Sequence, residues 1–309
     1  MTTPIRDSCT LDDLIEAYES HQRRTRGLRA QTLHNYRRLV RRFVHAALGD
    51  GPIDPSRLRP CDVIEFVDSI RTRFSPRSMK AVRTALRSFF RFLRAEGLCD
   101  GRLETAIPAV AHWRLSVLPR FLSDDQLEQV LSSLDVSSSL GRRDRAIVLC
   151  LATLGLRPGE VARLGLEDID WRSGTIRLHS RKNRRGALLP LPRRAGRAIA
   201  DYLRKERPPT EARCVFVRHN GPDRGKAISS NAVSAVAVRA LRRAHVEAPL
   251  AGAYVFRHSV ASRMVRHGAS LKEVADFLGH RSLDSATIYA KLDLPALHEV
   301  ALPWPEVVR

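Results

Sequence analysis

Apolar residues recur at helical spacing through most of the chain, and this repeat limits the possible folds more than any other feature. In the segments 33–47 and 76–93 they follow one another at intervals of three and four residues, as on the packed face of a helix. Alternation typical of strands is clearest in 171–191, where two runs flank the turn K-N-R-R-G, and Cys214 to Val217 is one more candidate strand. The sequence predicts a mainly α-helical protein with a small antiparallel β-sheet, an α+β fold.

Short signals mark several helix ends. Thr10 with Asp13 and Ser270 with Glu273 form capping boxes that predict helix starts, and Gly279 is expected to end the second of these helices. A last helix after Ser282 is expected to carry Tyr289.

A stretch between 108 and 121 separates two helical regions. It contains Pro108 and Pro119 and shows no clear period, as expected of a linker. A chain of 309 residues is also long enough for two domains. We predict a helical domain over 1–107 and a second domain, which holds the small sheet, over 122–309.

The chain is strongly basic, with 53 Lys and Arg against 33 Asp and Glu, a formal net charge of +20. An excess of this size indicates a polyanionic partner, and nucleic acid is the commonest. The polar faces of the helices around 33–47 and 76–93 are basic with few acids between. A basic face is often only solvated, but here we favour a DNA-facing surface. Its predicted contacts are Arg37, Arg38, Arg41, Lys80, Arg83, Arg87 and Arg91.

Five polar residues in the second half suit chemistry on a phosphodiester. Arg157 lies in T-L-G-L-R-P-G-E-V, Lys182 in H-S-R-K-N-R-R, Arg257 in V-F-R-H-S, His280 in L-G-H-R-S and Tyr289 in T-I-Y-A-K. Two arginines, a lysine and an imidazole can hold a phosphate on which negative charge builds. A tyrosine hydroxyl among them can attack phosphorus. The set predicts DNA strand exchange through a phosphotyrosine.

The motifs G-L-R-P-G-E-V-A-R-L, F-R-H-S-V-A-S, L-G-H and I-Y-A-K resemble the tyrosine recombinase (phage integrase) family over about 120–295. The helical N-terminal part resembles the core-binding domain of that family. The resemblance implies a two-domain, C-shaped clamp on double-stranded DNA recombination sites. It also implies a tetramer on paired sites, possible accessory recombinases as partners, and no metal, cofactor or ATP. The segment from about 292 resembles a tail that docks on the next protomer, although a tail folded onto its own domain remains an alternative.

The resemblance gives each residue a role. Tyr289 would be the nucleophile that forms a 3′-phosphotyrosyl bond and frees a 5′-hydroxyl. Arg157 and Arg257 would grip the non-bridging oxygens, since each guanidinium presents a planar fork of donors. Glu160, one turn after Arg157, is expected to orient that arginine.

Two further residues complete the expected chemistry. Lys182 would protonate the departing 5′-oxygen from the tip of the predicted hairpin. His280 would donate a hydrogen bond to a non-bridging oxygen. Arginines beside Lys182 are alternatives for the acid, and the choice of the lysine comes from the family pattern.

One position departs from the family pattern. The family usually has a histidine three residues before the second arginine, where this chain has Tyr254. We expect Tyr254 to donate a hydrogen bond to a phosphate oxygen, because a phenol is a poor base at neutral pH. The alternative is an aromatic side chain packed into the core. His258 is expected to be structural or buttressing, because a neighbour one position along points elsewhere on a helix.

Two other functions remain possible on the sequence alone: a type IB topoisomerase, which shares the chemistry, and a non-catalytic architectural protein with the same fold. The five cysteines form no C-x-x-C pair and no cysteine–histidine cluster of metal-ligand spacing, so we expect reduced thiols and no metal. No apolar run has membrane-spanning length. The expected location is cytoplasmic and nucleoid-associated.

Overall fold

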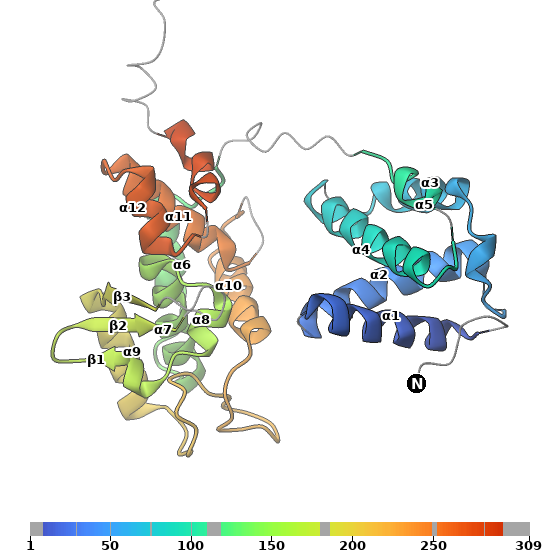
Figure 1. The fold of residues 1–309 in the computed structure, drawn as a ribbon. Coiled ribbons are helices and arrows are strands. Elements are labelled where there is room, and N and C mark those ends of the chain that lie inside the picture. The colour runs from blue at the N-terminus through green and yellow to red at the C-terminus, as the bar shows by residue number, and fades with distance from the viewer. Residues whose placement is uncertain are drawn as a thin grey trace, which may run out of the picture. The chain divides into compact units, whose positions relative to one another are not determined.

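The chain folds into two compact units, residues 1–113 and 114–309 (Figure 1). The division lies inside the segment 108–121, where a linker is predicted. The computed structural model describes residues 9–28, 30–49, 51–74, 76–99, 101–109, 119–179, 186–248, 252–280 and 282–292.

The first unit is helical throughout its described part. Thr10 starts its first helix with the predicted capping box: the threonine Oγ1 accepts from the backbone N–H of Asp13 at 3.2 Å, and the Asp13 carboxylate accepts from the N–H of Thr10 at 3.0 Å. Gly27 ends this helix in the left-handed conformation, at φ 54°. The helices are α1 Leu11–Arg26, α2 Ala30–Leu48, α3 Pro60–Arg71, α4 Pro76–Ala95 and α5 Arg102–Thr105, with a 3-10 turn η1 at Pro55–Arg57.

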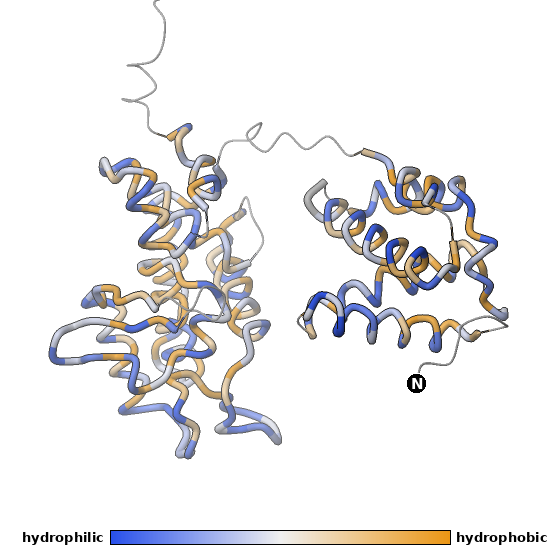
Figure 2. The backbone as a smooth tube through the Cα atoms, in the orientation of Figure 1, coloured by the Kyte–Doolittle hydropathy of each residue, from blue (hydrophilic) through white to orange (hydrophobic). Residues whose placement is uncertain are grey.

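Aromatic side chains fill the core of the first unit. Phe43 of α2 meets Phe66 of α3 and Phe90 of α4 edge to face, with ring centroids 5.3 and 5.4 Å apart. Tyr18 is fully buried and satisfies its hydroxyl on Ser88 Oγ at 3.0 Å. Figure 2 shows the apolar stripes of these helices turned toward one another. The period read from the sequence thus places the basic faces of α2 and α4 outside.

The second unit packs its helices around one buried helix. α7 carries apolar residues on all sides and contacts α9, α10 and α11. Ser138 caps it by accepting from the N–H of Gly141. The helices are α6 Asp124–Ser132, α7 Ser139–Leu154, α8 Pro158–Ala162, α9 Arg193–Lys205, α10 Ser230–Arg243, α11 Tyr254–Arg266 and α12 Leu271–Leu278, with 3-10 turns η2 Leu166–Asp168, η3 Leu283–Ser285 and η4 Thr287–Leu292.

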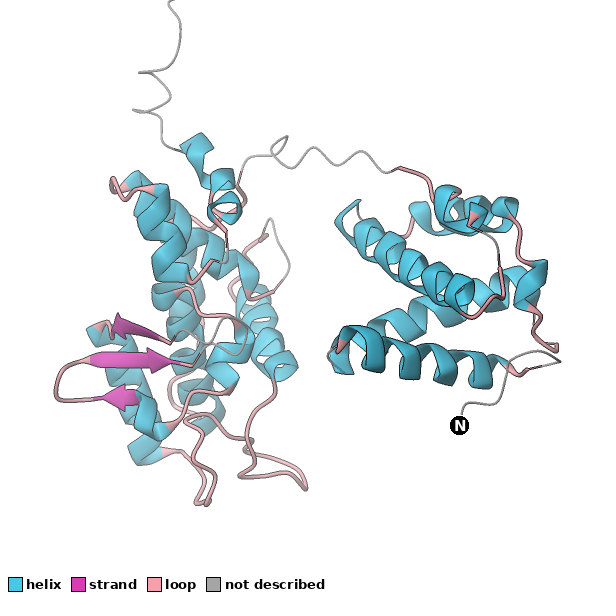
Figure 3. Cartoon of the chain, in the orientation of Figure 1, coloured by secondary structure: helices cyan, strands magenta, loops and turns pink. Residues whose placement is uncertain are grey.

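A three-stranded antiparallel sheet lies beside these helices (Figure 3). The strands β1 Ile169–Asp170, β2 Thr175–Leu178 and β3 Ala187–Pro190 pair in chain order. Ile176 stands opposite Ile169 on one side and Leu189 on the other, and all three are buried. The predicted mainly helical fold with a small antiparallel sheet is confirmed.

Local details differ from the sequence prediction. The strand expected from Trp171 onward begins only at Thr175, because the Asp170 carboxylate accepts the N–H groups of Arg172 and Ser173 and closes a turn. The residues 214–217, expected as a possible strand, form only isolated bridges. The expected helix around Tyr289 is a 3-10 helix, a form that occurs in short runs.

No helix in the described part of the chain is long and apolar enough to cross a membrane.

Candidate active site

Four of the predicted site residues come together in the second unit. Arg157 precedes α8, Arg257 lies within α11, His280 follows α12 and Tyr289 lies on η4. α11 contacts both α12 and η4, so it forms the centre of the cluster (Figure 1). The remaining predicted residue, Lys182, falls in 180–185, outside the described residues.

Arg257 is the buried member of the cluster, with 6% of its surface exposed. Its Nη1 donates to the carbonyl oxygen of Gly155 at 2.7 Å and its Nη2 donates to that of Leu278. Burial, together with the nearby charge of Arg157, lowers the pKa of Arg257 to about 10. The guanidinium therefore stays charged at neutral pH while two carbonyl groups hold it in place.

Arg157 is held from two directions. The Glu160 carboxylate accepts two hydrogen bonds from Arg157, one from its backbone N–H at 2.8 Å and one from its side-chain Nη1 at 2.7 Å. The carboxylate therefore fixes both the backbone and the guanidinium of this arginine. The arginine Nη2 donates to the carbonyl oxygen of Gly279 at 3.1 Å. Pro158 then begins α8 with its φ already suited to a helix. These contacts are what the orienting role predicted for Glu160 requires.

His280 lies directly after the left-handed Gly279, which ends α12 at φ 60°. Its backbone N–H donates to the carbonyl oxygen of Ala275 at 2.8 Å. The ring Nδ1 is buried and has no hydrogen-bond partner among the residues that the structure describes. Burial and the charges of Arg257 and Arg157 lower the pKa of His280 to about 4. The imidazole is therefore neutral at pH 7, with one donor and one acceptor.

Tyr289 is buried, with 2% of its surface exposed. Its hydroxyl lies 2.7 Å from Nδ1 of His258. Burial raises the pKa of Tyr289 to about 12, because the phenolate would lose its hydration, and the charge of Arg257 opposes this shift. The phenol is consequently protonated at neutral pH in the absence of DNA.

The contact with His258 corrects the expectation that this histidine points away from the site. Successive residues on a helix lie about 100° apart. Arg257 is directed toward the ends of α7 and α12, and His258 toward η4. The prediction assumed that all site residues share one face of α11, whereas the cluster surrounds the helix on two faces.

Tyr254 is the first residue of α11 and is 56% exposed. The alternative that it packs into the core is therefore wrong. It lies one turn before Arg257 and His258, and its phenol influences the pKa of Arg257. The side chain is thus placed at the open side of the cluster.

The basic residues predicted to contact DNA lie on α2 and α4. These two helices carry no acid of their own, but neighbouring helices supply partners: Arg37 pairs with Glu19 at 3.6 Å, and Arg41 pairs with Asp12. Similarly, Arg91 Nε lies 3.1 Å from a Glu104 oxygen. The Arg41–Asp12 pair is exposed on both sides, and such pairs contribute only about 0–1 kcal/mol, so it can open for a phosphate. The side chains of Glu19 and Glu104 are only 16% and 18% exposed, so opening their pairs with Arg37 and Arg91 costs more. The other predicted contacts are exposed Arg38, Lys80 and Arg87 and half-buried Arg83.

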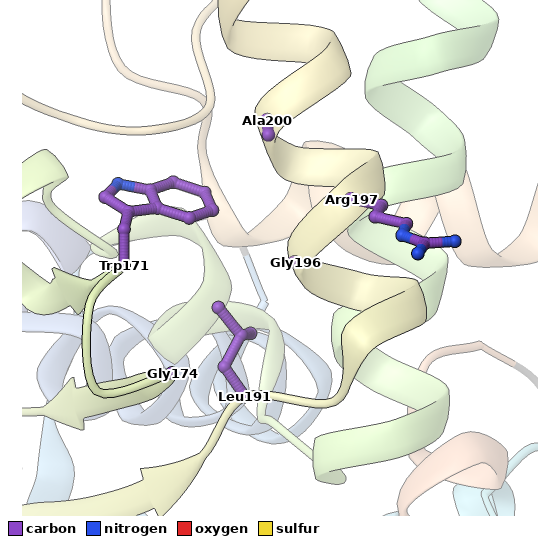
Figure 4. A pocket seen from close by; sticks show the side chains of 6 residues that line it. All are labelled: Trp171, Gly174, Leu191, Gly196, Arg197 and Ala200. Carbon is purple, nitrogen blue, oxygen red and sulfur yellow. The ribbon is translucent and has the colours of Figure 1, made fainter.

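A surface pocket lies apart from the predicted site residues, between the β1–β2 turn and α9 (Figure 4). Trp171, which is 50% exposed, lies on one side and α9 on the other, with Leu191 between them. Its lining residues are Trp171, Gly174, Leu191, Gly196, Arg197 and Ala200.

Comparison with known proteins gives the family of the chain. Residues 120–294 match the phage integrase family, and residues 15–97 match the N-terminal SAM-like domain of phage integrases. The chain therefore belongs to the phage integrase family, the tyrosine recombinases, which are DNA breaking-and-rejoining enzymes. The predicted class of protein is confirmed.

Curated relatives are similar over nearly the whole chain. A candidate integrase/recombinase of Sinorhizobium fredii, y4rA, is 44% identical over 94% of this chain and 70% of its own length. The tyrosine recombinase XerD of Listeria monocytogenes is 29% identical over 94% of this chain and 97% of its own length.

Two solved structures show the same fold. XerH recombinase bound to a palindromic difH substrate superposes with a TM-score of 0.71, at 20% identity, over 97% of this chain and 86% of that one. A λ integrase dimer bound to a core site gives 0.70, at 18% identity, over 97% of this chain and all of that one. At these identities the likeness establishes the fold, and both proteins were solved on DNA.

Proposed function

We propose that this chain is a site-specific DNA recombinase that cleaves and rejoins duplex DNA through a covalent bond between Tyr289 and a 3′-phosphate. The observation that carries the proposal is the placement of the Tyr289 hydroxyl, against an imidazole and beside a buried, charged arginine. A tyrosine that is buried only for packing does not need the side chains of Arg157, Arg257 and His280 beside it.

The chemistry needs two bonds to change. The Tyr289 oxygen bonds to phosphorus, and the bond from phosphorus to the 5′-oxygen breaks. Arg157 and Arg257 offer further N–H groups to the non-bridging oxygens while they keep their carbonyl contacts, because each guanidinium carries five N–H donors. Neutral His280 donates a further hydrogen bond, and Lys182 protonates the leaving 5′-oxygen.

Rejoining is the same reaction in reverse. The phosphotyrosyl bond keeps the energy of the phosphodiester, so a 5′-hydroxyl from a second strand can displace Tyr289 without ATP. Exchange between two duplexes requires copies of the protein on both. We therefore propose a homo-oligomer, a tetramer on paired sites, with accessory recombinases as possible partners. Solved neighbours of this fold include a λ integrase tetramer on a Holliday junction.

The first expected result concerns metals. The positive charge that metal ions give a two-metal nuclease is here supplied by Arg157, Arg257 and Lys182. The substrate is a nicked suicide substrate whose sequence is taken from the DNA flanking the gene. The protein should form the covalent complex with it equally well with and without excess EDTA. Denaturing gels measure it. Loss of the adduct in EDTA and its return with magnesium, at unchanged DNA binding, would refute the proposed chemistry.

Plasmid substrates separate the proposed function from its two alternatives. A recombinase should exchange a pair of its sites and leave a plasmid without sites supercoiled. A type IB topoisomerase relaxes any supercoiled plasmid, and an architectural protein does neither. Relaxation that needs no site would contradict site-specific recombination, as would binding without any strand cleavage.

A second expected result concerns Tyr254. Its exposed hydroxyl at the open side of the cluster suits a donor to phosphate, so Tyr254→Phe should bind DNA normally and cleave about 10- to 1000-fold more slowly. Tyr254→His should stay substantially active, because a neutral imidazole can donate in the same way. Single-turnover cleavage of a nicked substrate measures both. A Phe variant as fast as the parent would show that the hydroxyl has no role.

A further inference from the structure

Tyr289 must lose its proton to attack phosphorus. Its pKa of about 12 means that almost no phenolate exists at neutral pH. Burial also keeps bulk water away from the hydroxyl, because only 2% of the surface of Tyr289 is exposed. A neutral phenol is a weak nucleophile, and such groups are activated by a base within hydrogen-bond reach. The base must therefore be a neighbouring side chain.

His258 is in that place. Its Nδ1 lies 2.7 Å from the Tyr289 oxygen, inside the range for direct proton transfer. The two rings are 5.7 Å apart between centroids and inclined by 53°, so the contact runs edge to edge through the polar atoms and is not a stacking contact. In the neutral ring with its proton on Nε2, Nδ1 is an acceptor.

The other candidate bases are occupied or unsuitable. Glu160 already accepts two hydrogen bonds from Arg157. His280, whose pKa is lowered to about 4, is a much weaker base than an ordinary imidazole. Tyr254 has a phenol where the family usually has a histidine, and a phenol cannot take a proton near pH 7. Among the described residues, His258 is thus the base placed to act on the hydroxyl.

We propose that His258 is a catalytic residue, the general base that takes the Tyr289 proton on Nδ1 during cleavage. This inference rests on the proposed function. As the Tyr289 oxygen bonds to phosphorus, its proton moves to Nδ1 and the imidazole becomes a cation. The bond to the 5′-oxygen breaks, and that oxygen takes a proton from the proposed acid Lys182. In rejoining, the imidazolium returns its proton to the departing Tyr289 oxygen.

The assignment explains how the site works without a histidine at position 254. Residue 258 lies one helical turn after residue 254, so the two side chains project from the same face of α11. His258 can therefore act as a base close to the position where the family usually has its histidine. The charged and titratable groups around the pair then set its pH response. Arg257 acts on Tyr289, His280 lies within the electrostatic reach of His258, and Arg157 and Glu160 act in turn on Arg257.

Three variants separate a base from a structural contact. His258→Ala removes the ring. His258→Asn keeps a polar group close to the position of Nδ1, which can hydrogen-bond to the phenol but cannot take its proton. His267→Ala is the matched control, because His267 is an exposed histidine at the end of the same helix. Half-site binding and thermal unfolding of each variant check that folding is intact.

The expected results are measured as single-turnover cleavage of a nicked suicide substrate across pH. His258→Ala and His258→Asn should each lose about 10²- to 10⁴-fold in rate, the contribution of a general base, while His267→Ala matches the parent. The parent rate should fall as pH drops, because a protonated imidazole cannot accept the Tyr289 proton, and this fall should be absent in both variants. Added imidazole should restore cleavage to His258→Ala in proportion to its neutral form.

Each contrary outcome has a distinct meaning. A His258→Asn variant as fast as the parent would show that a hydrogen bond suffices and would overturn the inference. So would a slow His258→Ala variant that keeps the parent pH dependence and gains nothing from imidazole. In both cases the proposed function stands if Tyr289→Phe forms no adduct. An adduct in Tyr289→Phe would instead refute the proposed nucleophile, whatever His258 does.

Discussion

A Tyr289→Phe variant should bind its DNA site as the parent does and form no covalent complex with it. The change removes one oxygen from a buried ring and leaves the packing around α11 in place. Because that oxygen is the proposed nucleophile, the loss of cleavage should be complete and not partial. Denaturing gels with a nicked suicide substrate detect the adduct, and native gels measure binding.

Tyr202→Phe is the matched control for this variant. Tyr202 is also fully buried, and its hydroxyl likewise lies near an imidazole nitrogen, Nε2 of His219 at 3.3 Å, although those two rings are stacked. It lies on α9 and has no proposed role in catalysis. Tyr202→Phe should keep parent levels of covalent complex. If both variants lost the adduct, damage to the fold would explain the result; retained adduct in Tyr289→Phe would sink the assignment.

Arg257→Lys should be both slow and less stable. A lysine keeps the charge but cannot donate to two carbonyl oxygens and present a planar fork to phosphate. Cleavage should fall by about 10²- to 10³-fold or more, the scale for one lost donor to developing charge. The carbonyl groups of Gly155 and Leu278 would lose their donor, at about 1–3 kcal/mol for each buried group left unsatisfied.

Arg263→Lys on the same helix provides the comparison. Arg263 makes an ion pair with Asp124 at 2.9 Å in a more open setting, 28% exposed at the side chain. Its replacement should change the free energy of unfolding by well under about 1 kcal/mol and leave cleavage unchanged. Chemical denaturation and single-turnover rates measure the two effects. Equal behaviour of the two variants would contradict a special role for Arg257.

Local sequence signals predicted much of the fold. The capping boxes at Thr10 and Ser270 mark two helix starts, and Gly279 takes the left-handed form that ends a helix. These signals work because they act over a few residues. The pattern also named Arg157, Arg257, His280 and Tyr289 in advance, and the structure brings these four together.

Contacts between segments that are far apart in the chain could not be predicted from the sequence. Helical spacing predicts only a structural or buttressing role for His258, because its neighbour Arg257 occupies the expected face of α11, and only the path of η4 brings Tyr289 to the other face. The acids that pair with Arg37 and Arg91 come from α1 and α5, so neither shows in the charge pattern of its own helix. Such pairings depend on tertiary packing, which local spacing does not encode.

The two arginines of the cluster also stabilise the fold, and this affects which site residues are retained when a protein of this family loses its activity. Their guanidinium groups donate to the carbonyl oxygens of Gly155, Leu278 and Gly279, which tie the end of α7 to the end of α12. A descendant that abandons catalysis can lose the Tyr289 hydroxyl at little cost to its fold, whereas losing either arginine would weaken it. Inactive descendants should therefore retain the two arginines after the tyrosine has been replaced. The presence of both arginines alone is thus weak evidence that a protein of this family is an active enzyme.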